Sequence, residues 1–111
     1  MSNPKRGEIK VSLGEKTYDC KINMDTIMRI EQNCGRGILT IANGLSKAEM
    51  STQDMVSIMT PVLRSSGEDL KDKDVGKIIW EAGLTEGLRV IAEVVAFIIG
   101  GEDQGNVAAV G

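Results

Sequence analysis

Every second residue is apolar between positions 9 and 13, and again between positions 18 and 22. A period of two is typical of a β-strand with one buried face, and Gly14 between the two runs predicts a β-hairpin. A two-residue loop at Gly14 and Glu15 and a four-residue loop would both turn the same faces inward, so the register stays open. Two strands alone are marginally stable, and we therefore expect the hairpin to pack against helices.

After Ile22 the apolar residues recur every three or four positions, as they do on one face of a helix. Asn23 is a suitable N-cap for a helix that begins at Met24, and Gly35 is placed to end it in the left-handed conformation. The stretch GILTIANG predicts a second short helix that stops at Gly44.

A third helix has the clearest start signal. Ser51 followed three residues later by Asp54 is a capping-box pattern, and an apolar face follows it. Pro61 falls inside this helix, where it removes one backbone donor and crowds the carbonyl of Ser57, so we expect a kink there. The helix should end by Gly67.

A fourth helix is expected to open at Lys71 or Asp72 and to end at Gly83, with Trp80 lying off its apolar face. With a final long helix, these elements predict an α+β fold in which an N-terminal β-hairpin packs against a bundle of about four to five helices. We expect one domain over residues 1–101 and a flexible C-terminal tail over residues 102–111.

The last helical segment, GLTEGLRVIAEVVAFIIGG, is the most apolar part of the chain. One ridge at helical spacing, expected in the core, comprises Leu84, Leu88, Ile91, Val95 and Ile98. A second apolar stripe on its flank comprises Val90, Val94 and Phe97. Two interpretations stay open: the helix is buried on nearly all sides, or one stripe packs inside while the other docks a partner or a second copy of the chain. A membrane span is not expected, because charged residues interrupt the segment before it reaches about 20 apolar residues.

Composition narrows the class of protein. The 111 residues are 41% apolar and 3% aromatic, which suits one domain with an aliphatic core. The net charge is −3 and the basic residues are scattered, so nucleic acid is not an expected partner. The polar N-terminus has no secretory pattern, and we expect the protein in the cytoplasm.

The residues that could carry chemistry form no catalytic pattern. Cys20 and Cys34 lack the spacing of a zinc or redox site, and the chain has no histidine. Buried thiols are the simpler interpretation, although a disulfide stays open. The stretch GEDLKDKDVGK fails as a calcium loop because Val75 stands between Asp74 and Gly76. We expect a protein that is not an enzyme and needs no cofactor or metal, with a carboxylate-only or lysine-based site as the open exception.

The order of these parts also resembles the small tail assembly proteins of long-tailed phages and gene transfer agents. The resemblance runs from about Arg6 to Gly101 and is carried by an R-G-E opening before the hairpin, an R-S-S-G-type loop after the third helix, and a capped helix near LKDKDV. Lys71 departs from the pattern because related chains tend to carry Ser or Thr there, and the tail EDQGNVAAVG lies outside it.

The resemblance implies a tail assembly chaperone, a non-enzymatic protein that binds the tape measure protein and helps to recruit tail tube subunits in the bacterial cytoplasm. Its alternative is a structural tail or head-tail connector component that is retained in the virion. A homo-oligomer is compatible with either role. We expect the partner-binding or self-association surface at Trp80, Val90, Val94 and Phe97. Methionines at positions 24, 28, 50, 55 and 59 are a second candidate surface for apolar clients, with ordinary core packing as the alternative.

Overall fold

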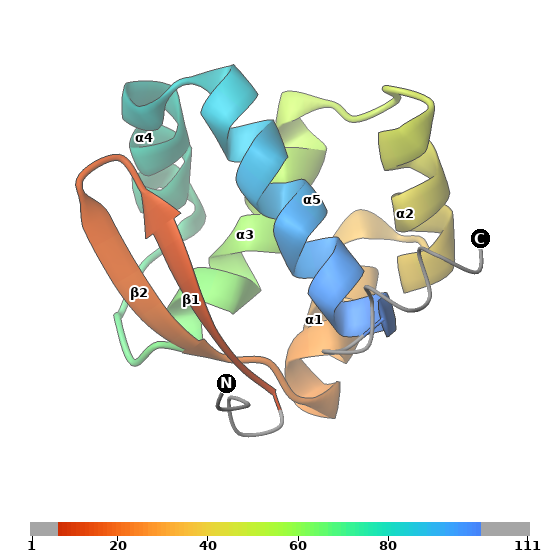
Figure 1. The fold of residues 1–111 in the computed structure, drawn as a ribbon, viewed down its shortest axis with the longest axis horizontal. Coiled ribbons are helices and arrows are strands. Elements are labelled where there is room, and N and C mark those ends of the chain that lie inside the picture. Colours follow the sequence, from red (N-terminus) through yellow and green to blue (C-terminus); the bar gives the residue numbers. More distant parts are fainter. Residues whose placement is uncertain (1–6, 101–111) are drawn as a thin grey trace.

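The computed structural model describes residues 7–100 and confirms the α+β architecture, a two-stranded antiparallel hairpin followed by five helices (Figure 1). The predicted tail over residues 102–111 lies outside the described residues. The elements are β1 (Glu8–Leu13), β2 (Lys16–Lys21), α1 (Met24–Cys34), α2 (Ile38–Ser46), α3 (Thr52–Arg64), α4 (Asp72–Ala82) and α5 (Leu84–Gly100).

The hairpin has the shorter of the two predicted loops. Leu13 pairs with Lys16, which leaves only Gly14 and Glu15 between the strands. Gly14 has a φ of +64°, the positive value that a tight hairpin turn requires at its first loop position. The alternation confirms the predicted inner face, because Val11, Leu13, Tyr18 and Cys20 are all buried.

Helix α1 begins and ends where the sequence predicts. The Asn23 side chain accepts a hydrogen bond from the Thr26 N–H at 3.0 Å, and Gly35 ends the helix with a φ of +69°. Helix α2, in contrast, does not stop at Gly44 but continues to Ser46. The reason is tertiary, because Leu45 packs against the core one residue beyond the glycine, and this burial outweighs the cost of about 1 kcal/mol of a helical glycine.

Helix α3 runs through Pro61 without an interruption of its helical assignment. Proline cannot donate to the carbonyl of Ser57, and Asn33 of α1 supplies the missing donor: its Nδ2 lies 3.2 Å from that oxygen. The predicted capping box is confirmed, with Ser51 accepting from the Asp54 N–H at 3.0 Å and Asp54 accepting from the Ser51 N–H at 3.2 Å.

Helix α4 begins at Asp72 after Lys71, whose side chain makes no capping hydrogen bond. Gly83, with a φ of +103°, separates it from α5. Helix α5 lies diagonally across the molecule, beside the hairpin and helices α2, α3 and α4 (Figure 1). The core that these elements enclose is aliphatic, and its largest fully buried members are Ile30, Ile41, Ile58, Met59, Leu63 and Ile91.

The orientation of α5 corrects the sequence prediction. Leu84 and Leu88 of the expected core ridge are 40% and 36% exposed, whereas Val90 and Val94 of the expected flank are buried. Gly87 lies on the buried face, where an added Cβ would approach the Met55 side chain to 2.9 Å. Ile91 and Val95 of the ridge are buried as predicted, so the correction concerns Leu84 and Leu88 near the start of the helix and the valines of the flank, which are buried together with the middle of the ridge.

Candidate functional site: an apolar groove between α2 and α5

An apolar groove of about 730 Å³ opens on the surface between α2 and α5. Leu88 and Ile99 of α5 remain exposed along it, at 36% and 45%. Its lining comprises Ala42, Leu45, Ser46, Ala48, Met50, Thr85, Leu88, Arg89, Ala92, Val95, Ala96, Ile99 and Gly100. The groove is therefore almost entirely uncharged and of a size that holds several side chains of a partner.

Small residues on both helices create the hollow. On α5, Leu88, Ala92 and Ala96 recur every four residues and therefore share one side of the helix. Ala42 lies on the facing side of α2. Since alanine side chains do not fill the space between the two helices, the apolar surface remains open to solvent.

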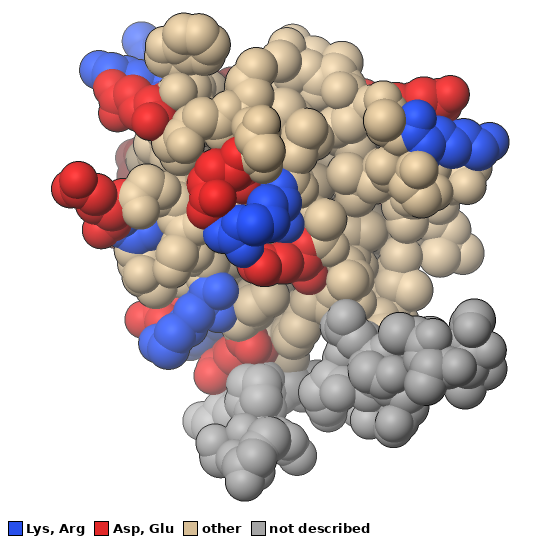
Figure 2. All heavy atoms as spheres, turned by 45° about the horizontal axis from the view of Figure 1, so that its top comes forward, with Lys and Arg blue, Asp and Glu red and all other residues tan. Residues whose placement is uncertain are grey.

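The one charged side chain in the lining is neutralised by its own helix. The Arg89 guanidinium donates from Nη2 to Glu86 Oε2 at 2.6 Å and from Nη1 to Glu93. These hydrogen bonds with Arg89 lower the pKa of Glu86 and raise the pKa of Arg89. In Figure 2 much of the surface consists of uncharged residues, and the charged side chains gather in a few compact clusters.

The four residues predicted for partner binding do not form one surface. Val90 and Val94 are 2% and 0% exposed and belong to the core, together with Ile91 and Val95 of the other stripe. Phe97 is half-buried and packs against the core. Only Trp80, at 72% exposed, stands free on the surface, and its partner-binding role stays a prediction.

Trp80 lies beside a smaller hollow between α3 and α4. This hollow measures about 410 Å³ and also contacts Leu84, which is 40% exposed. An exposed tryptophan beside an apolar hollow is the kind of feature that anchors protein interfaces. The surplus apolar surface of α5 therefore exists, but at Leu84, Leu88 and Ile99 rather than at the two valines.

The residues that shape the groove are not predicted by the two apolar stripes alone. Leu88 belongs to the ridge expected in the core, and Ala92, Ala96 and Ile99 belong to neither of the two predicted stripes. The sequence does contain a pattern that identifies this side of the helix, because Leu88, Ala92 and Ala96 are spaced four residues apart. The methionines divide similarly: Met55 and Met59 are core, Met24 and Met28 are exposed, and Met50 lines the groove.

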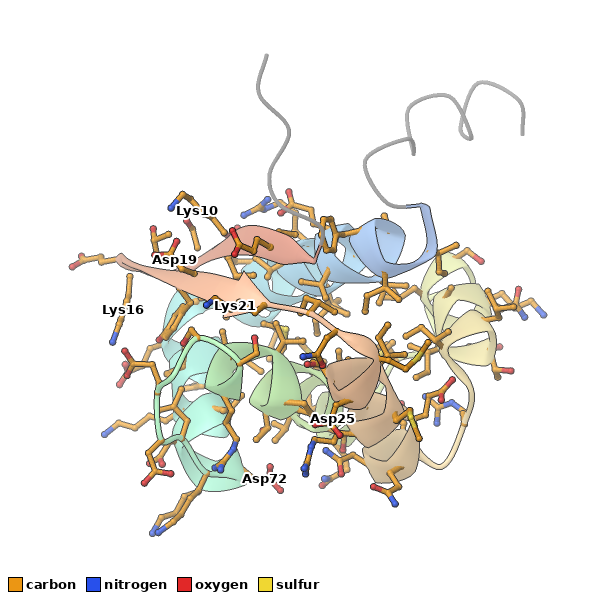
Figure 3. All side chains as sticks on the ribbon, turned by 90° about the horizontal axis from the view of Figure 1, so that it is seen from below. Lys10, Lys16, Asp19, Lys21, Asp25 and Asp72 are labelled. Atoms are coloured by element: carbon orange, nitrogen blue, oxygen red, sulfur yellow. The ribbon has the colours of Figure 1, made fainter. Side chains whose placement is uncertain are left out.

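The polar side chains are arranged mostly as surface pairs. On the outer face of the hairpin, Lys10 Nζ lies 2.6 Å from Asp19 Oδ1, whereas Asp25 and Asp72 lie at the starts of α1 and α4 (Figure 3). The last two border a polar hollow of about 630 Å³ between the length of α1, the end of α3 and the start of α4. Among the described residues, no group of three or more His, Cys, Asp or Glu side chains is arranged to hold a metal ion.

Both cysteines are free thiols. Burial raises the pKa of Cys20 to about 11, so this thiol stays protonated and unreactive near neutral pH. Burial also raises the pKa of Cys34, which is half-buried. Over residues 7–100, no helix combines the length and apolar character that a membrane crossing needs.

Over residues 6–101 the chain matches the model of a protein family described as phage tail tube protein, GTA-gp10. The match contains every helix and strand described above, including both sides of the groove. No curated protein and no solved structure matches the chain. The family description names a structural tail protein and no catalytic activity.

Proposed function

This chain belongs to the family of phage tail tube proteins described as GTA-gp10, and on that premise we propose that it is a structural component of the tail that remains in the assembled particle. The family match is the observation that carries this proposal. It favours the structural role over the chaperone role that the sequence resemblance implied.

The surface of the molecule supports a role that depends on contacts between proteins. The α2–α5 groove and the hollow beside Trp80 are separate apolar features lined by different residues. Contiguous exposed apolar surface on a small domain marks sites of association. Two different surfaces allow each subunit to contact two neighbours, as a repeating assembly requires.

A tail assembly chaperone that binds the tape measure protein and helps to recruit tail tube subunits is the second candidate. The groove supports it, because an amphipathic helix can lay its apolar face between two helices of a partner. Under this role the groove is occupied only until the tail is complete, and the protein is then released.

Mass spectrometry of purified particles separates the two roles. We expect the chain in amounts stoichiometric with other tail proteins if it is structural. Its absence from complete particles, together with its presence in lysates of producing cells, would replace the structural proposal with the chaperone role.

A matched pair of leucine substitutions tests the groove. Leu88→Asp places a charge in the groove, whereas Leu39→Asp places one on α2 at a residue that is 69% exposed and lies outside the lining. We expect Leu88→Asp to reduce the number of complete tails seen by electron microscopy and Leu39→Asp to leave it unchanged. Ile99→Asp provides a second groove variant if Leu88→Asp does not fold. If both groove variants fold and the number of complete tails is normal, the functional contact does not lie in the groove.

A further inference from the structure

We propose that the α2–α5 groove binds a second copy of this chain, in a two-fold dimer whose α5 helices pack antiparallel. The contact surface is one row of apolar residues on the exposed side of α5, together with the wall that α2 contributes to the groove. The row comprises Leu84, Leu88, Ala92 and Ala96. The inference goes beyond the proposed structural role, because it names the occupant of the groove and concerns the isolated chain.

The residues of this row change in size along the helix. They recur every four positions, so they form one ridge on the surface of α5. The leucines at positions 84 and 88 are exposed in the first part of the helix. The alanines at positions 92 and 96 follow them and line the groove beside α2, which packs against α5 (Figure 1). One half of the ridge therefore projects into solvent, and the other half leaves a hollow.

This order of sizes is complementary to itself when two copies run antiparallel. About a two-fold axis midway between positions 88 and 92, Leu88 lies opposite the partner's Ala92, and Leu84 lies opposite the partner's Ala96. Each large side chain then meets a small one, in both directions across the axis. A two-fold contact of this kind uses the same surface on both copies and closes at two chains.

Parallel arrangements do not match the sizes. Two parallel helices in the same register would place leucine against leucine and leave the space at the alanines unfilled. A parallel pair shifted by eight residues would match the leucines of one copy only, and the leucines of the other copy would stay exposed. The pattern of sizes therefore singles out the antiparallel dimer.

The hollow can receive the partner's leucine side chains. Ala42 faces it from α2, opposite the alanines of α5, and Met50 lines it with a thioether that adapts its conformation to a neighbour. The groove of about 730 Å³ is open to solvent on its outer side. Insertion of the leucines would remove both the leucines and the groove from water in one step, which favours association.

The charged side chains beside the ridge do not oppose this contact. Arg89 follows Leu88 directly and lines the groove, and it is hydrogen-bonded to Glu86 and Glu93 of its own helix. Its charge is thus compensated before two copies meet. The three charged side chains would lie at the edge of the contact, and an apolar centre with a polar rim is typical of protein interfaces.

The test exchanges large and small residues along the ridge and measures the mass of the isolated full-length protein by sedimentation equilibrium. Ala92→Leu places a leucine opposite the partner's Leu88, although it adds apolar surface to the groove. The double variant Ala92→Leu with Leu88→Ala restores one large and one small residue at each meeting point. Ala96→Leu and Leu84→Ala make the same exchange at the outer positions, as a second set. Leu39→Ala removes an exposed leucine of α2 outside the groove and is the control.

We expect the unmodified protein to form dimers that dissociate on dilution. Ala92→Leu should raise the dissociation constant of the dimer about tenfold or more, because two leucines then compete for one space. The double variant should return this constant to within about threefold of the unmodified protein, and Leu39→Ala should leave it unchanged. Circular dichroism shows which variants are folded, and the second set replaces the first if Leu88→Ala does not fold.

Three results would overturn the proposal. The first is a protein that stays monomeric up to about 1 mM. The second is tighter association of Ala92→Leu, which would mean that added apolar surface promotes contact without any matching of sizes. The third is a folded double variant that associates as weakly as Ala92→Leu alone. Because these measurements use the isolated chain, a negative result leaves the structural role to be decided by mass spectrometry of particles.

Discussion

At the scale of single residues, Asn33 compensates for a proline within a buried helix. Pro61 leaves the carbonyl of Ser57 without its helical donor, and the Asn33 amide contacts this oxygen from the neighbouring helix. The contact joins α1 to α3 at a fixed position. The sequence predicts the loss of a hydrogen bond at Pro61, but the kink expected from it stays a prediction.

Asn33→Ala should lower the free energy of unfolding by about 1 kcal/mol, because it leaves a carbonyl of a buried residue without a donor. In a Pro61→Ala background, the new N–H at position 61 can bond to Ser57, so the same change should cost much less. Urea unfolding of the four proteins in a double-mutant cycle measures this coupling. Equal costs in both backgrounds would show that Asn33 does not replace the missing donor.

Cys20 makes stability depend on pH in the alkaline range. Its pKa rises from an ordinary value of 9.0 to about 11 in the folded protein, because burial disfavours the thiolate. The unfolded chain therefore loses this proton first, and the free energy of unfolding should fall between about pH 9 and pH 11, by up to about 2 kcal/mol.

The measurement is urea unfolding across this pH range. Cys20→Ala should flatten the slope, even if its small cavity lowers stability at every pH. Burial also raises the pKa values of Cys34 and Tyr18. Cys34→Ala and Tyr18→Phe should therefore each remove a smaller part of the fall in unfolding free energy with pH, and most of that fall should remain. A slope that survives Cys20→Ala intact would assign it to other residues.

At the scale of the elements, two helical glycines have opposite roles. A Cβ on Gly87 of α5 would lie 2.9 Å from Met55 Cε and 3.1 Å from Ile79 Cγ2, both on buried side chains. A Cβ on Gly76 of α4 would meet Val56 Cγ2 at 3.7 Å, an ordinary contact distance. The absence of a side chain at Gly87 thus lets α5 pack closely against α3 and α4, whereas Gly76 has room for a methyl group.

Gly87→Ala should lower the free energy of unfolding by about 1 kcal/mol, because the new methyl group meets the branched Ile79 side chain at 3.1 Å, where little movement is possible, although the flexible end of Met55 can move aside. Gly76→Ala should raise it by about 0.5 to 1 kcal/mol, since only the propensity changes. Thermal unfolding of the two variants provides the comparison. If both substitutions stabilise the protein, there is more room beside Gly87 than the distances to Met55 and Ile79 indicate.

The elements also separate what sequence can predict from what it cannot. Alternation fixes the inner face of the hairpin, and local caps at Asn23, Ser51 and Gly35 fix helix ends, because these signals act within a few residues. The end of α2 depends on Leu45 reaching the core, and the close approach of α5 to α3 and α4 depends on the absence of a side chain at Gly87. Such contacts join residues far apart in sequence, and a single helix cannot reveal them.

At the scale of the whole molecule, the sequence predicts exposed apolar surface but places only part of it correctly. Of the expected residues Trp80, Val90, Val94 and Phe97, the structure exposes Trp80 and buries the two valines, and it leaves another side of α5 open as the groove. The amount of apolar surface follows from composition. Its location follows from which side of α5 the remaining elements cover.

The exposure of Trp80 has a spectroscopic consequence. Indole fluorescence responds to the polarity around the ring, and the only tryptophan of this chain already faces water in the folded monomer. Denaturation should therefore change its emission wavelength little, whereas a subunit or partner that covers α4 should shift the emission to the blue. The protein thus carries an intrinsic optical reporter that responds to assembly and is nearly silent to unfolding.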